Sequence, residues 1–175
     1  MQQLNKERKD YWHMKFENYY LIECFDSQGR LKWIERIENL ITSEGLDDVL
    51  DKYLKGSAYT AAFYVGLTDG TPTVAAGDTM ASHAGWTEIV AYSEATREVY
   101  TLGTVSGQSV DNSASKASYS INGTATIGGC FLTTNSTKSG STGTLYGVGA
   151  FTGGDRSVLS GDTLNVTVTS TAASA

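Results

Sequence analysis

Polar and apolar residues alternate in the segment Thr163-Leu164-Asn165-Val166-Thr167-Val168-Thr169. Successive side chains of a β-strand point to opposite faces, so this period of two predicts a strand with one buried face. The segment Lys116-Ala117-Ser118-Tyr119-Ser120-Ile121 has the same alternation. Together the two segments predict a sheet that covers a core on one side.

Other segments after residue 56 are also rich in strand-forming residues. They are residues 61–68, 86–92, 98–102, 125–133 and 144–151. Polar stretches at 103–115 and 135–143 read as loops. About seven short strands, without helices between them, predict a mainly-β fold of the β-sandwich or jelly-roll kind, with an irregular small barrel as the alternative.

The composition changes near Gly56 and suggests two parts that share a core. Only three of the 19 glycines lie in residues 1–56, whereas that segment is rich in charge. We therefore expect an N-terminal arm, β-hairpin and helix in residues 1–56, and a β-sandwich domain in residues 57–175. The first part is too small to bury a core of its own.

Within the first part, residues 19–25 and 31–37 favour strands, and they flank a turn-forming cluster at 26–30 that contains Gly29. This pattern predicts a hairpin. A helix is expected next, with Ser43 as its N-cap and Gly56 after its last turn. Its apolar residues recur at helical spacing: Leu46, Val49, Leu50, Tyr53 and Leu54.

Charge and cysteine content narrow the classes of function. The net charge is −6 and the pI about 4.8, which disfavours general binding to a polyphosphate backbone. No signal peptide or membrane-spanning stretch is recognisable, so we expect synthesis in the cytoplasm and no membrane contact. Cys24 and Cys130 lie among apolar residues and are expected to be free and buried, with a disulfide as the less favoured alternative.

The sequence contains few groups that could converge into a catalytic centre. His83 is interpreted as a loop histidine that packs on Trp86 and hydrogen-bonds to nearby backbone, rather than as a base or a metal ligand. Glu88, Glu94 and Glu98 are the candidates for a glycosidase pair, but acidic residues are also common on solvent faces. We predict no catalytic residues, no cofactor and no metal site.

Aromatic residues are dense near the N-terminus. They are Tyr11, Trp12, Phe16, Tyr19 and Tyr20. An extended arm with this much apolar area needs something to cover, and a neighbouring subunit is the natural candidate. We therefore predict that these five residues contact a partner protein.

Several segments resemble a family of small proteins encoded among the virion morphogenesis genes of tailed bacteriophages. The central ones are YVGLTDG at 64–70 and AAGDTMASHAGWTE at 75–88. Others are NLI at 39–41, GLDDVL at 45–50, YSEATR at 92–97, DNSA at 111–114 and FLTTN at 131–135. The resemblance extends from about residue 20 to 170 and brings no catalytic residues with it.

The resemblance implies a structural protein of the virion, made in the host cytoplasm. The expected function is capsid decoration, in which a cement protein binds the major capsid protein and copies of itself, with a homotrimer favoured. The alternative is a tail-associated fibre or adaptor that contacts tail proteins or host glycan. A carbohydrate-cleaving enzyme of the particle is the third and least favoured hypothesis.

Overall fold

The computed structural model describes residues 14–59 and 62–174. The chain is mainly β, with antiparallel strand pairs and one short helical segment, as the sequence predicted. The strands are β1 Met14–Phe25, β2 Leu31–Ile41, β3 Tyr64–Asp69, β4 Glu88–Ile89, β5 Glu98–Val99, β6 Ser109–Asp111, β7 Ala117–Ser120, β8 Ala125–Thr133, β9 Leu145–Ala150, β10 Arg156–Val158 and β11 Thr163–Ser174. The helical segment is α1 Ser43–Val49 followed by a π-helical turn, η1 Leu50–Leu54.

The predicted hairpin is confirmed and is longer than expected. β1 and β2 pair on either side of a turn in which Gly29 has a φ of 75°, a conformation that favours glycine. The Asp26 carboxylate accepts hydrogen bonds from the backbone N–H of Gln28 and Arg30 and so closes the turn. Over its whole length β1 also pairs with β11, from Met14 opposite Ser174 to Phe25 opposite Thr163.

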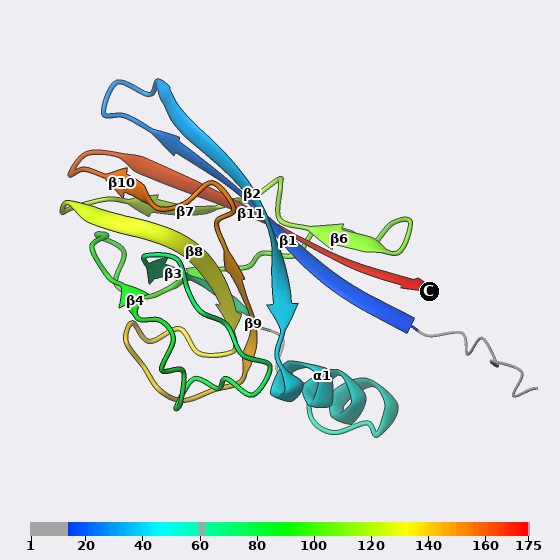
Figure 1. Cartoon of the computed structure of the whole chain (residues 1–175). Coiled ribbons are helices and arrows are strands. Elements are labelled where there is room, and N and C mark those ends of the chain that lie inside the picture. Colours follow the sequence, from blue (N-terminus) through cyan, green and yellow to red (C-terminus); the bar gives the residue numbers. More distant parts are fainter. Residues whose placement is uncertain (1–13, 60–61, 175) are drawn as a thin grey trace, which may run out of the picture.

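The sheet curls into two layers because β2 changes partner along its length. Its first part pairs with β1, whereas Asn39–Ile41 pair with β9. The strand order is β4-β3-β8-β9-β2-β1-β11-β6, so β2 carries the sheet from one layer to the other (Figure 1). The N-terminal hairpin thus belongs to the same sheet as the strands after residue 56.

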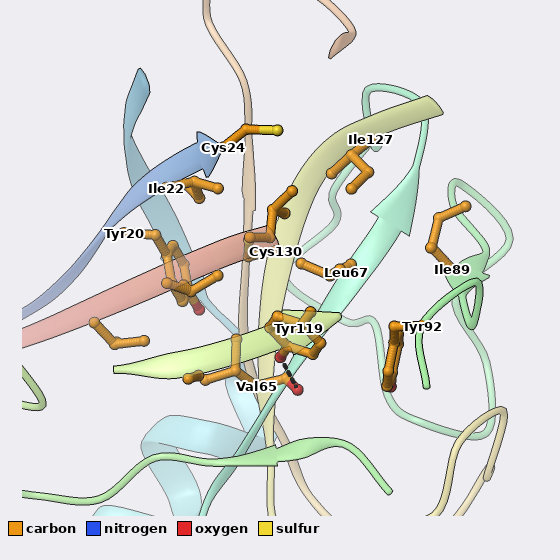
Figure 2. Close-up of a cluster of buried hydrophobic side chains, with 14 of the residues drawn as sticks. Tyr20, Ile22, Cys24, Val65, Leu67, Ile89, Tyr92, Tyr119, Ile127 and Cys130 are labelled. Atoms are coloured by element: carbon orange, nitrogen blue, oxygen red, sulfur yellow. Dashed lines mark hydrogen bonds between the residues drawn. The ribbon is translucent and has the colours of Figure 1, made fainter. Parts of the chain in front are cut away.

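The main core lies between these layers. Side chains of β1, β7 and β11 meet those of β3 and β8, as Figure 2 shows for Ile22, Tyr119, Leu67 and Ile127. The hydroxyl of Tyr119 crosses the core and donates to the carbonyl of Val65 at 2.7 Å. The predicted alternation is confirmed, because the apolar positions of β7 and of residues 164–168 are buried.

The predicted helix is confirmed, with its N-cap one residue earlier than expected. The side chain of Thr42, rather than that of Ser43, accepts from the backbone N–H of Gly45. Gly56 follows the last turn with a φ of 78°. The first turn packs on the sheet, where Gly45 is buried against the backbone of Tyr146 in β9.

The structure differs from the expected strands in four places. The segments 86–92 and 98–102 form only the two-residue strands β4 and β5. β6 lies within a segment expected to be a loop, and β10 was not expected at all. These strands are too short to show a period of two, so the sequence pattern could not reveal them.

Candidate functional site

A pocket of about 260 Å³ lies beside the central sequence motif. His83, Trp86 and Glu88 line it on one side, and Arg97 with the loop residues 139–141 lines it on the other. β4 holds Glu88 at the edge of β3, whereas Arg97 lies just before β5, which pairs with the same strand. The structure therefore brings together residues from three separate segments of the chain.

Arg97 and Glu88, which both line this pocket, form a buried ion pair. The Nε and Nη2 atoms of Arg97 donate to the two carboxylate oxygens of Glu88 at 2.8 and 2.7 Å. Arg97 also donates to the backbone carbonyls of Asn135 and Gly140 and lies over the ring of Phe131. This paired geometry fixes the loop after β8 against β4.

Of the carboxylates considered for glycoside cleavage, two are held by neighbouring structure. Glu88 accepts from Arg97 and from the backbone N–H of Ser139 at 2.7 Å. Glu94 accepts from the backbone N–H of Ser120 at 3.0 Å. Burial raises the pKa of the third, Glu98, and the neighbouring Glu94 raises it further. Glu88 and Glu94 thus each accept hydrogen bonds from neighbouring parts of the structure.

The contacts expected of His83, on Trp86 and on nearby backbone, are present in the structure. Its ring stacks on Trp86 with centroids 3.8 Å apart and an interplanar angle of 17°. Nδ1 of His83 donates to the carbonyl oxygen of Trp86 at 3.1 Å, since a carbonyl can only accept. In the neutral ring Nε2 is then the acceptor. Trp86 in turn packs on Phe131, so the motif anchors its loop on β8.

The second candidate site is an exposed apolar helix face, which we define as Leu46, Leu50, Tyr53 and Leu54. Their exposed fractions are 45%, 50%, 84% and 70%. Spacing of this kind normally marks the buried side of a helix. Here α1 and η1 project beyond the end of the sheet (Figure 1), and the described chain leaves this face uncovered. An apolar face of this size is typical of an interaction surface.

The structure corrects part of the prediction for the N-terminal aromatic residues. Tyr20 is fully buried in the core, and its hydroxyl accepts from the Asn39 side chain, so its assignment as a partner contact is wrong. Phe16 and Tyr19 are half-buried in β1 rather than part of an extended arm. Tyr11 and Trp12 lie outside the described residues.

Both cysteines are free and buried, as expected. Burial raises the pKa of the Cys24 thiol to about 11 and raises that of Cys130 as well. Within residues 14–59 and 62–174, His, Cys, Asp and Glu side chains form no group of three or more that could hold a metal ion. None of the described helices is long and apolar enough to span a membrane.

Sequence reasoning missed two features of these sites. Arg97 is 1% exposed, yet a single arginine in a polar stretch carries no signal of burial. The apolar spacing of the helix was recognised, but periodicity cannot tell whether the chain itself or another molecule covers it. That distinction depends on where the helix lies in the fold.

The chain is mainly β, and its described residues form a pocket beside Glu88 and Arg97 and an exposed apolar helix face. No known family model matches the chain. No curated protein matches it either.

Proposed function

We propose that this protein is a non-enzymatic structural component of a tailed-bacteriophage virion that decorates the capsid shell. The observation that carries the proposal is the exposed helix face. Exposed apolar side chains at the end of a sheet with a buried core are typical of a protein that binds other subunits. The resemblance of residues 64–70 and 75–88 to virion proteins supports the placement in a phage particle.

The structural partners of the pocket residues agree with a non-enzymatic role. The Glu88 carboxylate is held by Arg97 and Ser139, and His83 is held by Trp86. These contacts stabilise loops. In this proposal the protein is made in the host cytoplasm and joins the shell through the major capsid protein and copies of itself.

The first test is the copy number of the protein in purified virions, measured relative to the major capsid protein by quantitative mass spectrometry. A decoration protein is expected at a number comparable to the capsid protein. A small fraction of that number would overturn decoration and favour a place on the tail.

The helix face provides a second test of the same proposal. Virions assembled with Leu50→Glu should lack the protein, because the charged side chain prevents burial of the face. The control is Val105→Glu, since Val105 is also exposed but lies in a loop far from the helix in sequence. Equal incorporation of both variants would contradict assembly through the helix face.

One observation favours the alternative, a tail-associated protein that contacts host glycan. The pocket combines an aromatic stack, His83 on Trp86, with the hydroxyl-bearing residues Ser139 and Ser141. Sugar-binding sites use flat rings and hydroxyl groups in this way. Purified protein that blocks phage adsorption, and loses this effect with His83→Ala, would support the alternative; no binding to host cells would remove it.

A further inference from the structure

We infer that Asn122 is a site of spontaneous covalent modification, at which the side-chain amide is converted to a carboxylate. The attacking group is the backbone nitrogen of Gly123, and the only co-reactant is water. The inference goes beyond the proposed function and does not depend on it. Three observations carry it: the exposure of Asn122, the free backbone amide of Gly123, and the contrast with Asn112 and Asn135, whose side chains are held.

Asn122 and Gly123 lie in the short connection between β7 and β8. β7 pairs with β11 and β8 pairs with β3, so this connection joins the two layers of the sheet. Asn122 is exposed, although its backbone N–H donates to the carbonyl of Ala91 at 3.1 Å. In the part of the chain that the structure describes, the Asn122 side chain and the Gly123 N–H have no hydrogen-bond partner. Both reacting groups are therefore free.

The reaction closes a succinimide ring and then opens it. The Gly123 nitrogen gives its proton to water or hydroxide and bonds to Cγ of Asn122. The bond between Cγ and Nδ2 breaks, and Nδ2 takes up a proton and leaves as ammonia. Water then adds to one of the two ring carbonyls. Addition at Cγ gives aspartate, whereas addition at the main-chain carbonyl gives isoaspartate, in which the main chain runs through Cγ.

Glycine at position 123 favours the attack. It has no Cβ beside the attacking nitrogen, and its backbone reaches unusual conformations at low cost. The two groups belong to adjacent residues, so the step is intramolecular and needs no encounter. Asn122 is the only asparagine in the sequence that is followed by glycine.

Asn135 and Asn112 show how the fold protects other asparagine side chains. The Asn135 side-chain oxygen accepts from the N–H of Thr137 at 2.7 Å, and its Nδ2 donates to the hydroxyl of Thr142 at 2.8 Å. Asn112 is buried and bonds to two backbone groups of β11. Turning either side chain onto the following nitrogen would break these hydrogen bonds, whereas Asn122 has none to lose.

The modification should loosen the connection between the layers. Each product adds a negative charge to a chain whose net charge is already −6. Isoaspartate also adds a methylene group to the main chain, between the N–H that bonds to Ala91 and the start of β8 at Ala125. The longer connection no longer matches its two fixed ends.

The test is peptide mapping by mass spectrometry of the full-length protein, kept at pH 7, 8 and 9. The converted fraction of Asn122 should grow with time, at a rate that rises about tenfold per pH unit, because the attacking amide must lose its proton. Gly123→Ala should slow the conversion about tenfold, since a Cβ beside the nitrogen raises the barrier. Asn122 that stays intact in the folded protein, but converts in urea, would overturn the inference.

The Gly123→Ala variant should fold like the wild type. Gly123 does not adopt the left-handed conformation, and an added Cβ would meet only the Cβ of Ala91, at an ordinary contact distance of 3.7 Å. A slower conversion in this variant therefore reports on the reaction and not on a damaged fold. An unchanged rate would exclude the Gly123 nitrogen as the attacking group.

Ser136→Gly is the matched control, because it places a glycine after Asn135. Asn122 and Asn135 then differ in their hydrogen bonds but not in the residue that follows them. In the folded variant Asn122 should convert about tenfold faster than Asn135, whereas in urea the two rates should be similar. Equal rates in the folded variant would overturn the selection of Asn122 by the structure.

Asn122→Asp separates the effect of the charge from that of the longer main chain. This variant carries the carboxylate without the added methylene group, so its thermal midpoint should equal that of fresh wild type. Wild type that has accumulated isoaspartate should unfold at a lower temperature. Aged protein as stable as fresh protein would overturn the loosening of the connection.

Discussion

Two hydrogen bonds join the side chains of Arg97 and Glu88, one to each carboxylate oxygen, and both side chains are buried, with exposed fractions of 0% and 6%. A charge removed from water in this way depends on its partner, because no solvent replaces the lost contact. The pair also joins β4 to the loop after β8. Its loss should therefore loosen the packing of that loop against the rest of the pocket.

Arg97→Met should lower the free energy of unfolding by about 3 to 5 kcal/mol, because it leaves the Glu88 carboxylate buried without its cation. Urea unfolding followed by circular dichroism measures this change. Lys15→Met is the matched control, since it breaks the exposed Lys15–Glu17 pair and should leave stability unchanged. Equal effects of the two substitutions would show that the Arg97 pair is not buried in solution.

Asn112→Ala should destabilise the protein by about 2 to 3 kcal/mol, because it removes the side chain that pairs with two backbone groups of β11. The Asn112 side chain is 1% exposed; it accepts from the N–H of Val168 and donates to the carbonyl of Val166. It thereby bridges the gap between β6 and β7 along β11. In this variant hydrogen exchange of the Val168 amide should accelerate. Asn122 is exposed, so the control Asn122→Ala should change neither the stability nor this exchange rate.

Gly45→Ala should lower stability by about 1 to 3 kcal/mol, as overpacking does. The added Cβ would lie 2.6 Å from the backbone oxygen of Tyr146, where the helix meets β9. Helix propensity alone predicts the opposite sign, a gain of about 1 kcal/mol. Gly77→Ala is the control because no atom lies within 4 Å of its added Cβ. Thermal unfolding of both variants decides between the two signs.

Stability should fall as the pH rises above about 9, because buried thiols and phenols then ionise in the unfolded chain. Burial raises the pKa of Cys24 to about 11 from 9.0 and that of Tyr146 to about 12 from 10.0. It also raises the pKa values of Tyr20 and Tyr119. In the folded state these groups keep their protons. The stabilisation that they contribute is therefore fully present below the pKa values of the unfolded chain, and it is lost as the pH rises through the pKa values of the folded protein.

Urea midpoints measured at pH 7, 9 and 10.5 test this dependence. Cys24→Ala and Tyr146→Phe should each reduce the loss between pH 9 and 10.5, because each removes one group that ionises on unfolding. A midpoint that stays constant over this range would contradict the burial of these groups.

The sequence predicted the parts of the fold that rest on local pattern. The alternation around Tyr119 and Val166 placed these residues in the core, and the turn at 26–30 defined the hairpin. It could not predict that β1 continues back to Met14, because that extension depends on pairing with β11, about 150 residues away. Tyr20 was misassigned for the same reason.

Prediction of the sites was limited in a similar way. The contact of His83 with Trp86 is local and was anticipated, whereas the partners of Arg97 come from residues 88, 135 and 140. The exposed helix face was visible as a pattern of leucines. Only the structure, in which Gly45 packs on β9 and the leucines are exposed, shows that the pattern points away from the sheet.

The pairing of β1 with β11 also determines how the protein would carry a mechanical load. Met14 lies opposite Ser174, so a force that pulls these two residues apart would open the twelve-residue ladder one pair at a time. A force applied to Met14 and Thr163 would instead load the whole ladder in shear. The sheet should therefore resist a load that enters along its strands, whereas a tether joining residues 14 and 174 would peel them open.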